Sequence, residues 1–468
     1  MYSMNQIIFQ IGCYLPILCK YLFLLLDYVY ERLYNIKEEN YSTEKRRKNM
    51  KTISVIGLGN RGTEYMGFIK GMHFKKAKIV ALCDISQQAL DDIAPKFGIP
   101  KDKQFISADD FFAQGQISDA LFITTQDMSH YEITKNALLT GYKYILLEKP
   151  VSGIEAEYKE LRDLAEEKGA LLIVCHVLRY ANYYSKIKEI IESGQIGDIV
   201  TINHTENVGY YHFAHSFVRG NWRDEFTSTP SLLAKCCHDL DLIAWFMDSP
   251  CETVSSVGSL KFFRKEYAPL GAAESCMGGC KAKKNCPYDA EKFYITDPFY
   301  KAKFIKFMKR TLTGKAKNSK EDVVDAIKNG DYGKCVFLND NNVCDNQLVT
   351  MTFKNGASAV LQLNAFSEKM FRQSHIVGTK GELIGYNARL EMKIFGEKSK
   401  VVFKGSPSAQ GHGEGDMRLI SGFVKLLCGE NKDLTNITTI DATVISHDIA
   451  LAAEKSRKNG GEVVRLGE

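Results

Sequence analysis

The stretch Ile53-Ser-Val-Ile-Gly-Leu-Gly-Asn-Arg-Gly62 joins a short apolar run to a glycine-rich turn. The apolar run predicts a buried β-strand, and the spacing of Gly57, Gly59 and Gly62 predicts a tight turn that opens a helix. The first glycine permits the turn, the second lets the backbone approach a phosphate, and the third lets the helix pack on the strand. Free N–H groups and the positive end of the helix dipole would then face an anion. The stretch therefore predicts a pyrophosphate site.

Apolar runs alternate with helical patterns from Thr52 to about Cys175, which predicts βαβ units around a parallel sheet. Asp84 ends the second strand and lies 22 residues after Gly62. Dinucleotide-binding folds place an acid near this position to bind the adenosine ribose. Residues 85–87 supply no Arg or Lys for a 2′-phosphate. We therefore expect NAD rather than NADP.

Polar residues follow two further strands of this sheet. Thr124, Thr125 and His130 come after the strand 119–124, and Glu148-Lys149-Pro150 follows the strand 144–147. Ligands of open parallel sheets collect beyond the carboxyl ends of the strands. We therefore expect both segments to face one crevice, with the Lys149 side chain projecting into it.

Together with a later His238-Asp-Leu-Asp241, these motifs resemble those of the glucose-fructose oxidoreductase, inositol dehydrogenase and MocA family, over residues 51–466. The resemblance implies an α/β fold: an N-terminal Rossmann domain (residues 50–176), then an α+β domain (177–468) with a large, open, mostly antiparallel sheet. It also implies that Lys149 contacts the reacting hydroxyl, that the Lys149–Pro150 bond is cis, and that the open sheet face is buried in a homo-oligomer. The expected cofactor-binding residues are Gly57, Gly59, Asn60, Arg61, Gly62, Asp84, Thr124, Thr125, His130, Glu148 and Lys149.

His238 is the expected catalytic acid/base. Apolar residues recur at helical spacing from Leu240, which places His238 in the first turns of a helix, with Asp241 on the same face to orient the imidazole. Imidazole titrates near neutral pH, so it can accept and return the proton of a hydroxyl. Lys149 would stabilise the developing negative charge on the oxygen.

One position departs from the family pattern. The family's dehydrogenases commonly carry an aspartate four residues before this histidine, and here that position is Ala234. Three alternatives stay open: His238 works with Lys149 alone, another residue such as Lys235 or Asp239 substitutes, or the reaction differs from simple alcohol oxidation.

Other residues are candidates for the substrate site. Arg179 and Tyr180 stand at the crossing into the second domain. The segment 411–416 either brings backbone close to a ligand or forms a flexible loop with Asp416 as the cap of a following helix (419–427). A polar and aromatic cluster, Asn203, His204, Glu206, Tyr210, Tyr211 and His212, suits a sugar pocket. The candidate substrate residues are Arg179, Tyr180, Lys235, Asp239, Asp241 and His412.

An insertion at residues 264–345 interrupts the second domain. It carries Cys276, Cys280 and Cys286 and helical patterns near 298–312 and 319–329. Zinc would need a fourth ligand such as Cys236, Cys237, Cys335, Cys344 or a histidine, and the C-x-x-C pairs of structural zinc sites are absent. We therefore expect no metal here, and an insertion that caps the sugar site or an oligomer contact.

Composition is that of a globular protein: 468 residues, 45% hydrophobic and 25% charged, long enough for two or three domains. Basic and acidic residues intermix with a net charge of +5, which argues against nucleic-acid binding.

Residues 1–49 form an extension with interrupted apolar runs, too short for a convincing membrane span. Thirteen cysteines without regular spacing predict mostly free thiols. We expect a cytoplasmic protein that does not bind membranes.

The sequence thus predicts an NAD-dependent oxidoreductase that moves hydride between nicotinamide and a hydroxyl of a sugar, sugar derivative or cyclic polyol. One alternative is a redox glycosidase, in which a retained NAD oxidises a sugar transiently and so permits elimination of the aglycone. A second alternative is a non-catalytic, NAD-binding regulatory protein.

Overall fold

The computed structural model describes residues 50–296, 303–405, 412–430 and 436–467. Residues from Lys51 onward form one compact unit. The predicted extension at residues 1–49 lies outside the described residues. Among the described residues, no helix combines the length and the apolar character needed to cross a membrane.

The first sheet is entirely parallel, and its strands lie in the order β3-β2-β1-β4-β5-β6. The chain reverses its direction of winding between β1 and β4, where an α/β sheet opens a crevice at its carboxyl edge. This arrangement confirms the predicted Rossmann domain and places the glycine turn at that crevice. The strands are β1 Lys51–Ile56, β2 Ala77–Cys83, β3 Gln104–Phe105, β4 Ala120–Ile123, β5 Tyr144–Leu147 and β6 Leu171–Val174.

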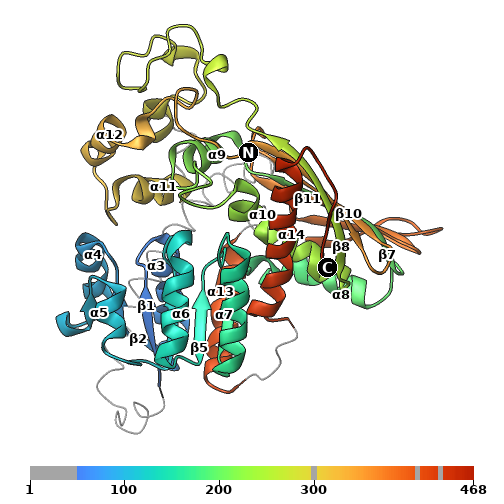
Figure 1. The fold of residues 1–468 in the computed structure, drawn as a ribbon, viewed down its shortest axis with the longest axis horizontal. Helices are drawn as coiled ribbons and strands as arrows, with labels where there is room; N and C mark the ends of the chain where they lie inside the picture. The colour runs from blue at the N-terminus through green and yellow to red at the C-terminus, as the bar shows by residue number, and fades with distance from the viewer. Residues whose placement is uncertain (1–49, 297–302, 406–411, 431–435, 468) are drawn as a thin grey trace, which may run out of the picture. The chain divides into compact units, whose positions relative to one another are not determined.

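Helices connect these strands and cover the sheet (Figure 1). The turn from β1 into α3 needs its glycines. Gly57 has φ of +96°, and a Cβ added there would lie 2.6 Å from the backbone of Thr124; one added at Gly62 would lie 2.2 Å from the Gly57 carbonyl oxygen. The helices are α3 Asn60–Met72, α4 Gln87–Phe97, α5 Ala108–Phe112, α6 His130–Thr140 and α7 Glu155–Glu167.

The second sheet has nine strands in the order β14-β13-β12-β11-β7-β10-β9-β8-β15. Its pairs are antiparallel except β10 with β7, so the predicted mostly antiparallel sheet is confirmed. The strands are β7 Ile199–Asn207, β8 Cys251–Ser259, β9 Asn346–Phe353, β10 Ser358–Asn364, β11 Phe371–Gly378, β12 Gly381–Tyr386, β13 Arg389–Ile394, β14 Lys400–Lys404 and β15 Val464–Arg465.

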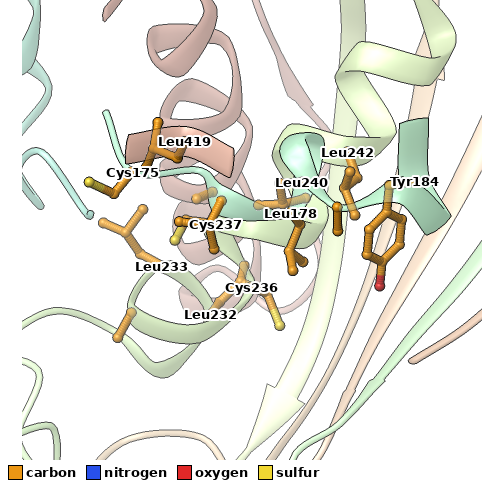
Figure 2. Close-up of a cluster of buried hydrophobic side chains, with 14 of the residues drawn as sticks. Cys175, Leu178, Tyr184, Leu232, Leu233, Cys236, Cys237, Leu240, Leu242 and Leu419 are labelled. Atoms are coloured by element: carbon orange, nitrogen blue, oxygen red, sulfur yellow. The ribbon is translucent and has the colours of Figure 1, made fainter. Parts of the chain in front are cut away.

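The long helix α10 (Ser231–Met247) lies at the centre of the second domain. Leu232, Leu233, Cys236, Cys237 and Leu240 pack against residues from the end of the first sheet and from the neighbouring helices (Figure 2). The helix begins at Ser231, so His238 stands in its middle and not in its first turns as the sequence predicts. Since α10 is buried almost all round, its first half has no polar face and shows no clear helical period.

Helices from the C-terminal half return to the first domain. Helix α14 (Ile440–Lys458) contacts both α10 and α7, and Val174 N–H donates to the Thr438 carbonyl at 2.8 Å. Helix α13 (His412–Leu427) contacts α3 and starts seven residues earlier than expected, so Asp416 lies inside a helix and does not cap one. Helix α8 is Asn182–Glu192.

The insertion between β8 and β9 contains α11 (Lys303–Thr313) and α12 (Lys320–Asn329); the expected start of the former near 298 lies outside the described residues. It has a small core of its own that includes Phe293, Met308 and Val323. The short helices of the chain are η1 Lys101–Lys103, η2 Asp127–Ser129, η3 Val177–Tyr180, α9 Tyr210–Phe213, η4 Ala214–Arg219, η5 Lys265–Tyr267, η6 Lys283–Asn285, η7 Lys292–Thr296 and η9 Asp331–Gly333.

Candidate active site

The glycine turn is shaped to receive a ligand. Asp84 accepts hydrogen bonds from Leu58 N–H at 2.6 Å and Ser86 N–H at 2.8 Å, while the Thr124 hydroxyl donates to the Gly57 carbonyl at 2.6 Å. Gly59 caps α3 without a side-chain hydrogen bond, and a Cβ added there would meet nothing within 4 Å. Within the described residues, a helix N-terminus without a side-chain cap and with open space at Gly59 fits the pyrophosphate of a dinucleotide.

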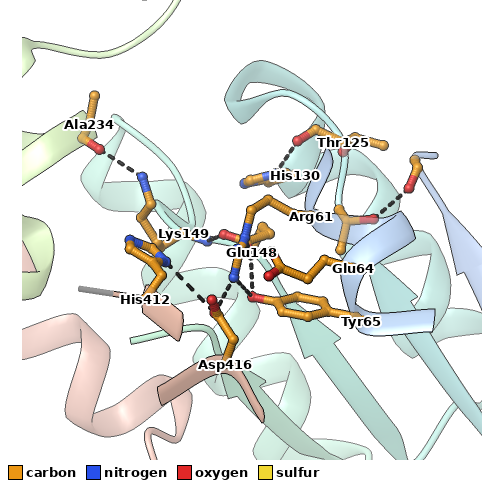
Figure 3. A network of polar contacts seen from close by, with 12 residues as sticks. Arg61, Glu64, Tyr65, Thr125, His130, Glu148, Lys149, Ala234, His412 and Asp416 are labelled. Carbon is orange, nitrogen blue, oxygen red and sulfur yellow. Dashed lines mark hydrogen bonds and ion pairs between the residues drawn. The ribbon is translucent and has the colours of Figure 1, made fainter. Parts of the chain in front are cut away.

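Arg61 connects this turn to the Glu148-Lys149-Pro150 segment (Figure 3). Its guanidinium donates to Glu148 at 3.1 Å, to the Tyr65 hydroxyl at 2.7 Å and to Glu64 at 2.8 Å, and it makes a short contact with Asp416 on α13. The Tyr65 hydroxyl also donates to Glu148 at 2.6 Å. Arg61, predicted to bind the cofactor, thus has its donors committed to protein groups and holds three segments together.

The Glu148 carboxylate is buried within this network. Burial alone would raise its pKa, but the charges of Arg61 and Lys149 and the hydroxyl of Tyr65 hold the pKa below its usual value. Glu148 therefore stays ionised and acts as a fixed negative charge next to the lysine.

Lys149 reaches across to the second domain. The Lys149–Pro150 peptide bond is cis, as the resemblance implies. Its Nζ donates to the backbone carbonyl of Ala234 at 2.8 Å, so the ammonium lies one helical turn before His238 on α10 (Figure 3).

His238 is 2% exposed, and neither of its ring nitrogens has a hydrogen-bond partner among the described residues. Its ring lies edge-to-face with those of His176 (5.7 Å between centroids) and His412 (5.0 Å). Burial, followed by the nearby charges of His412 and Lys149, puts the pKa of His238 well below the usual value for histidine. The imidazole is therefore neutral at pH 7 and has a free lone pair for a proton.

The expected orienting role of Asp241 is wrong. Its carboxylate forms a buried bidentate pair with Arg179, at 2.6 and 2.7 Å, and is not hydrogen-bonded to His238. Asp239 likewise binds Arg372 (2.6 Å) and His204 (2.8 Å). Neither carboxylate occupies the place of the aspartate that Ala234 lacks.

Lys235 pairs with Glu206 at 3.3 Å, and both side chains are largely buried. Glu206 also contacts Arg372, so the substrate candidates Lys235 and Asp239 belong to one charged cluster. His204 and Glu206 point into this cluster, whereas Asn203, which directly precedes His204 on β7, is exposed because successive side chains of a strand face opposite sides. His212, from the same predicted pocket, contacts Met370 at 3.1 Å.

His412 lies opposite His238 and comes from the distant helix α13. Its Nδ1 is 3.7 Å from the Asp416 carboxylate, one turn further along the same helix. Burial lowers the pKa of His412, although Asp416 acts in the opposite direction. Asp416 thus lies next to His412, whose ring in turn packs against that of His238.

His130 is placed differently from the prediction. Its Nδ1 lies 2.6 Å from the Pro150 carbonyl oxygen and its Nε2 lies 3.1 Å from that of Thr125, so both ring nitrogens are used by the backbone. His130 thus ties the loop after β4 to the lysine loop. The hydroxyl of Tyr180 is likewise occupied, because it is hydrogen-bonded to the side chain and the backbone N–H of Thr438.

The sequence gives no signal for two residues near this site. His176, two residues after β6, faces His238, and neither of its ring nitrogens has a hydrogen-bond partner in the described part of the chain. Arg310, in the insertion, donates to the Leu58 carbonyl at 2.6 Å and to the Thr63 hydroxyl at 2.9 Å, while Asn60 donates to Thr311 at 3.0 Å. The insertion thus contacts the glycine turn directly, from 247 or more residues away along the chain.

One group of residues near the site has the composition of a metal-ligand set. The ligand atoms of His176, Cys237 and His238 all lie within 4.8 Å of one another. The Lys149 ammonium lies close enough to lower the pKa of each of these three groups, after the dominant effect of burial on each. That positive charge disfavours a second cation, and the open ring nitrogens suit the hydroxyls of a substrate.

Two family models match the chain. The Rossmann model of an NAD-binding oxidoreductase family matches residues 51–176, and the model of that family's C-terminal alpha/beta domain matches residues 188–466. The chain belongs to the glucose-fructose oxidoreductase, inositol dehydrogenase and MocA family. The resemblance read from the glycine turn, Lys149 and His238 is thereby confirmed.

Within this family the chain is similar to one protein from Bacillus subtilis and one from Salmonella paratyphi B. It is 31% identical to the scyllo-inositol 2-dehydrogenase (NADP(+)) IolW of B. subtilis over 140 residues, 30% of this chain and 37% of that protein. It is 23% identical to the inositol 2-dehydrogenase of Salmonella paratyphi B over 205 residues, 43% of this chain and 55% of that protein. The matches thus span about a third to a half of these relatives.

The fold is shared with solved structures of the family. An oxidoreductase from Agrobacterium radiobacter, crystallised with NAD+, L-tartaric acid and magnesium, aligns with a TM-score of 0.62 and 16% identity, over 89% of this chain and 98% of that one. At 16% identity, this similarity shows a shared fold and nothing more specific.

Proposed function

We propose that this protein is an NAD-dependent oxidoreductase that transfers hydride between nicotinamide and a hydroxyl-bearing carbon of a sugar, sugar derivative or cyclic polyol. The observation that carries the proposal is that Lys149 binds the Ala234 carbonyl, one helical turn before a neutral, buried His238 whose ring nitrogens have no hydrogen-bond partner among the described residues. The inositol dehydrogenases among its relatives support a polyol-like substrate.

The chain's own groups provide the proton chemistry. His238 accepts the hydroxyl proton on a ring nitrogen, which burial keeps neutral and ready. Lys149 donates a hydrogen bond to the same oxygen and stabilises its negative charge as the proton leaves. Bound NAD+ supplies the hydride acceptor, and the uncapped start of α3 would hold its pyrophosphate. Burial of His238 and His176 excludes water that would compete for the substrate's hydroxyls.

NAD is the proposed cofactor rather than NADP. The Asp84 carboxylate stands at the end of β2, where the 2′-phosphate of NADP would bring a second negative charge. The related IolW uses NADP(+), so the choice needs its own measurement. We expect a lower Kd for NAD+ than for NADP+, determined by calorimetry under the same salt conditions.

A redox glycosidase is the second candidate. It requires a cofactor that stays bound through repeated turnovers, and the contacts of Arg310 and Thr311 with the glycine turn support such retention. Ala234 also supports it, because the carboxylate common to the dehydrogenases is absent. Cleavage of an aryl glycoside without net NADH formation would favour this candidate, and stoichiometric NADH with free sugars would favour the dehydrogenase.

The decisive experiment compares His238→Asn and Lys149→Met with the unchanged protein on a panel of sugars, inositols and aryl glycosides. We expect each variant to lower kcat by about 10²–10⁴-fold while the Kd of NAD+ stays within a few-fold. His375→Gln, which replaces a half-exposed histidine on β11, is the control and should leave kcat unchanged. No turnover by the unchanged protein, with NAD+ bound, would favour the regulatory alternative.

We also propose that the protein is a cytoplasmic homo-oligomer joined through the open face of the nine-stranded sheet. That face carries exposed apolar side chains on alternating strand positions, among them Val257, Leu348, Ile384 and Tyr386. Apolar patches of this kind are commonly covered by a partner. Sedimentation analysis of the unchanged protein and of Ile384→Lys tests the proposal, because the variant should dissociate the oligomer.

A further inference from the structure

Four cysteines of the second domain surround one small cavity. Cys276, Cys280, Cys286 and Cys335 line a space of about 20 Å³, which is room for about one water-sized occupant. The first three come from the start of the insertion, and Cys335 comes from its other end. The fourth cysteine that the sequence pattern lacks is therefore supplied by the fold.

Backbone pairing brings Cys335 to the others. Cys276 N–H donates to the Gly333 carbonyl at 2.8 Å, and Cys335 N–H donates to the Glu274 carbonyl at 2.7 Å. Ser275 and Lys334 form an isolated antiparallel bridge between these two bonds. The two segments are thus fixed side by side, with one cysteine on each.

A buried cation faces the same cavity. The Arg219 guanidinium, 2% exposed, donates to the carbonyls of Lys334 and Tyr288, both at 2.7 Å, and to the Cys276 sulfur at 3.5 Å. Among the described residues it has no ion pair with a carboxylate, and Asp289, which also lines the cavity, is not within reach of it as a salt-bridge partner. A buried guanidinium without an anion is unfavourable, so this position calls for negative charge.

We propose that Cys276, Cys280, Cys286 and Cys335 bind one structural Zn²⁺ ion, independently of the proposed function. Four thiols would release their protons and coordinate the ion tetrahedrally, the arrangement that zinc prefers with sulfur ligands. The resulting site carries a net charge of −2, and Arg219 neutralises part of it. This revises the expectation of no metal, which rested on the absence of C-x-x-C pairs: Cys335, one of the possible fourth ligands, lines the same cavity as the other three cysteines.

Binding requires the sulfurs to turn inward. Among the described residues, the group near His238 is the one whose ligand atoms all lie within 4.8 Å, so the four cysteine sulfurs are further apart than in a loaded site. Rotation about the Cα–Cβ bonds of the cysteines would have to bring the four sulfurs together. The set near His238 has one thiol and a neighbouring lysine, so zinc there would leave excess positive charge.

A zinc ion at this place would rigidify the insertion, which has only a small hydrophobic core of its own. The insertion's own core is small, and short segments with small cores depend on metals or other cross-links for stability. The same insertion carries Arg310, which contacts the glycine turn. The ion would thus hold the insertion in the shape that presents Arg310 to the cofactor site.

The test is elemental analysis of the full-length protein, purified without chelator and desalted. We expect about one zinc per chain, lost by at least five-fold in Cys335→Ser and retained in Cys428→Ser, which removes a cysteine outside the cavity. Cobalt exchange into the unchanged protein should give the intense sulfur-to-cobalt absorption of a tetrahedral thiolate site. This second measurement holds even if Cys335→Ser fails to fold.

Several results would overturn the proposal. These are the absence of stoichiometric metal, iron and sulfide in place of zinc, a disulfide between two of the four cysteines in the native protein, or zinc lost from Cys237→Ser but kept in Cys335→Ser. The last result would assign the metal to the group near His238.

Discussion

The Lys149 ammonium donates a hydrogen bond of 2.8 Å to the backbone carbonyl of Ala234. This contact joins Lys149, the lysine of the family's Glu-Lys-Pro motif, to position 234, where the aspartate that is common in the family is missing. A main-chain oxygen, which no substitution at Ala234 removes, thereby orients the lysine. The carboxylate that would have polarised His238 has no replacement on α10, and Asp416 on α13 lies next to His412, whose ring packs against that of His238.

The pH profile should reveal the neutral state of His238. Because burial and the charges of His412 and Lys149 lower the pKa of His238, the acidic limb of kcat/KM should have its midpoint below the usual histidine value of about 6.5. His412→Asn removes one of these charges, so its midpoint should rise by up to about one pH unit. Measured profiles with a midpoint above 6.5 in the unchanged protein would contradict the assignment of His238 as base.

Asp416→Asn should destabilise the protein. Asp416 is fully buried and its carboxylate faces Arg61, so the substitution leaves a guanidinium short of one anion. We expect a loss of about 2–3 kcal/mol in the free energy of unfolding, measured with urea. Glu64→Gln is the matched control, because Glu64 pairs with the same arginine from an exposed position and should change stability by less than about 1 kcal/mol. Equal losses in the two variants would argue against a special role for the buried pair.

Arg310→Ala should weaken the binding of NAD+. The side chain lies on the glycine turn, and its loss removes a cation and two hydrogen bonds from the wall of the cofactor site. We expect the Kd to rise about 5–30-fold, equivalent to roughly 1–2 kcal/mol. Lys317→Ala removes the same charge from an exposed position of the insertion and should not change the Kd. An unchanged Kd in Arg310→Ala would show that the contact only docks the insertion.

His447 should make the protein sensitive to acid. Its Nε2 accepts from Val151 N–H at 3.0 Å and its Nδ1 donates to the Thr443 carbonyl at 3.1 Å, an arrangement that only the neutral ring satisfies. Burial and the neighbouring His176 lower the pKa of His447 to about 3 in the folded protein. The unfolded chain takes up this proton near pH 6.5, so stability should fall as the pH drops from about 6.5 to about 3.

Urea unfolding at several pH values measures this effect. His447→Asn should reduce the slope of the unfolding free energy against pH in that range, even though its stability at pH 7 is lower. His375→Gln, at the half-exposed position, should leave the slope unchanged. An unaltered slope in His447→Asn would assign the acid sensitivity to other buried groups, such as His215, whose pKa burial also lowers to about 3.

Much of the fold follows from local patterns. The expected strand over 144–147 matches β5 residue for residue, because it is a short apolar run that ends at a charged residue. The predicted place of His238 in the first turns of α10 was wrong, since a helix buried on all sides has no clear helical period. The start of α13 was missed for another reason: the glycines between His412 and Asp416 are typical of loops.

The partners of the charged residues could not be read from the sequence. The spacing of His238 and Asp241 predicts a shared helix face, yet Arg179, 62 residues away, takes the carboxylate in a buried pair. Similarly, Asp239 was a candidate to replace the aspartate that is missing at Ala234, but its carboxylate is held by Arg372 from β11. Helical spacing gives proximity, while the strongest available counter-charge decides the contact.

The sequence by itself determined the cofactor fold and the family, because the glycine turn, Asp84, Lys149 and His238 each depend on backbone geometry that a few neighbouring residues specify. Only the tertiary structure decided what surrounds them. His412 meets His238 across 174 residues of chain, Arg310 reaches the glycine turn, and Cys335 meets three cysteines from the other end of the insertion. Such contacts arise from the packing of separate elements around shared cores, and no local pattern encodes them.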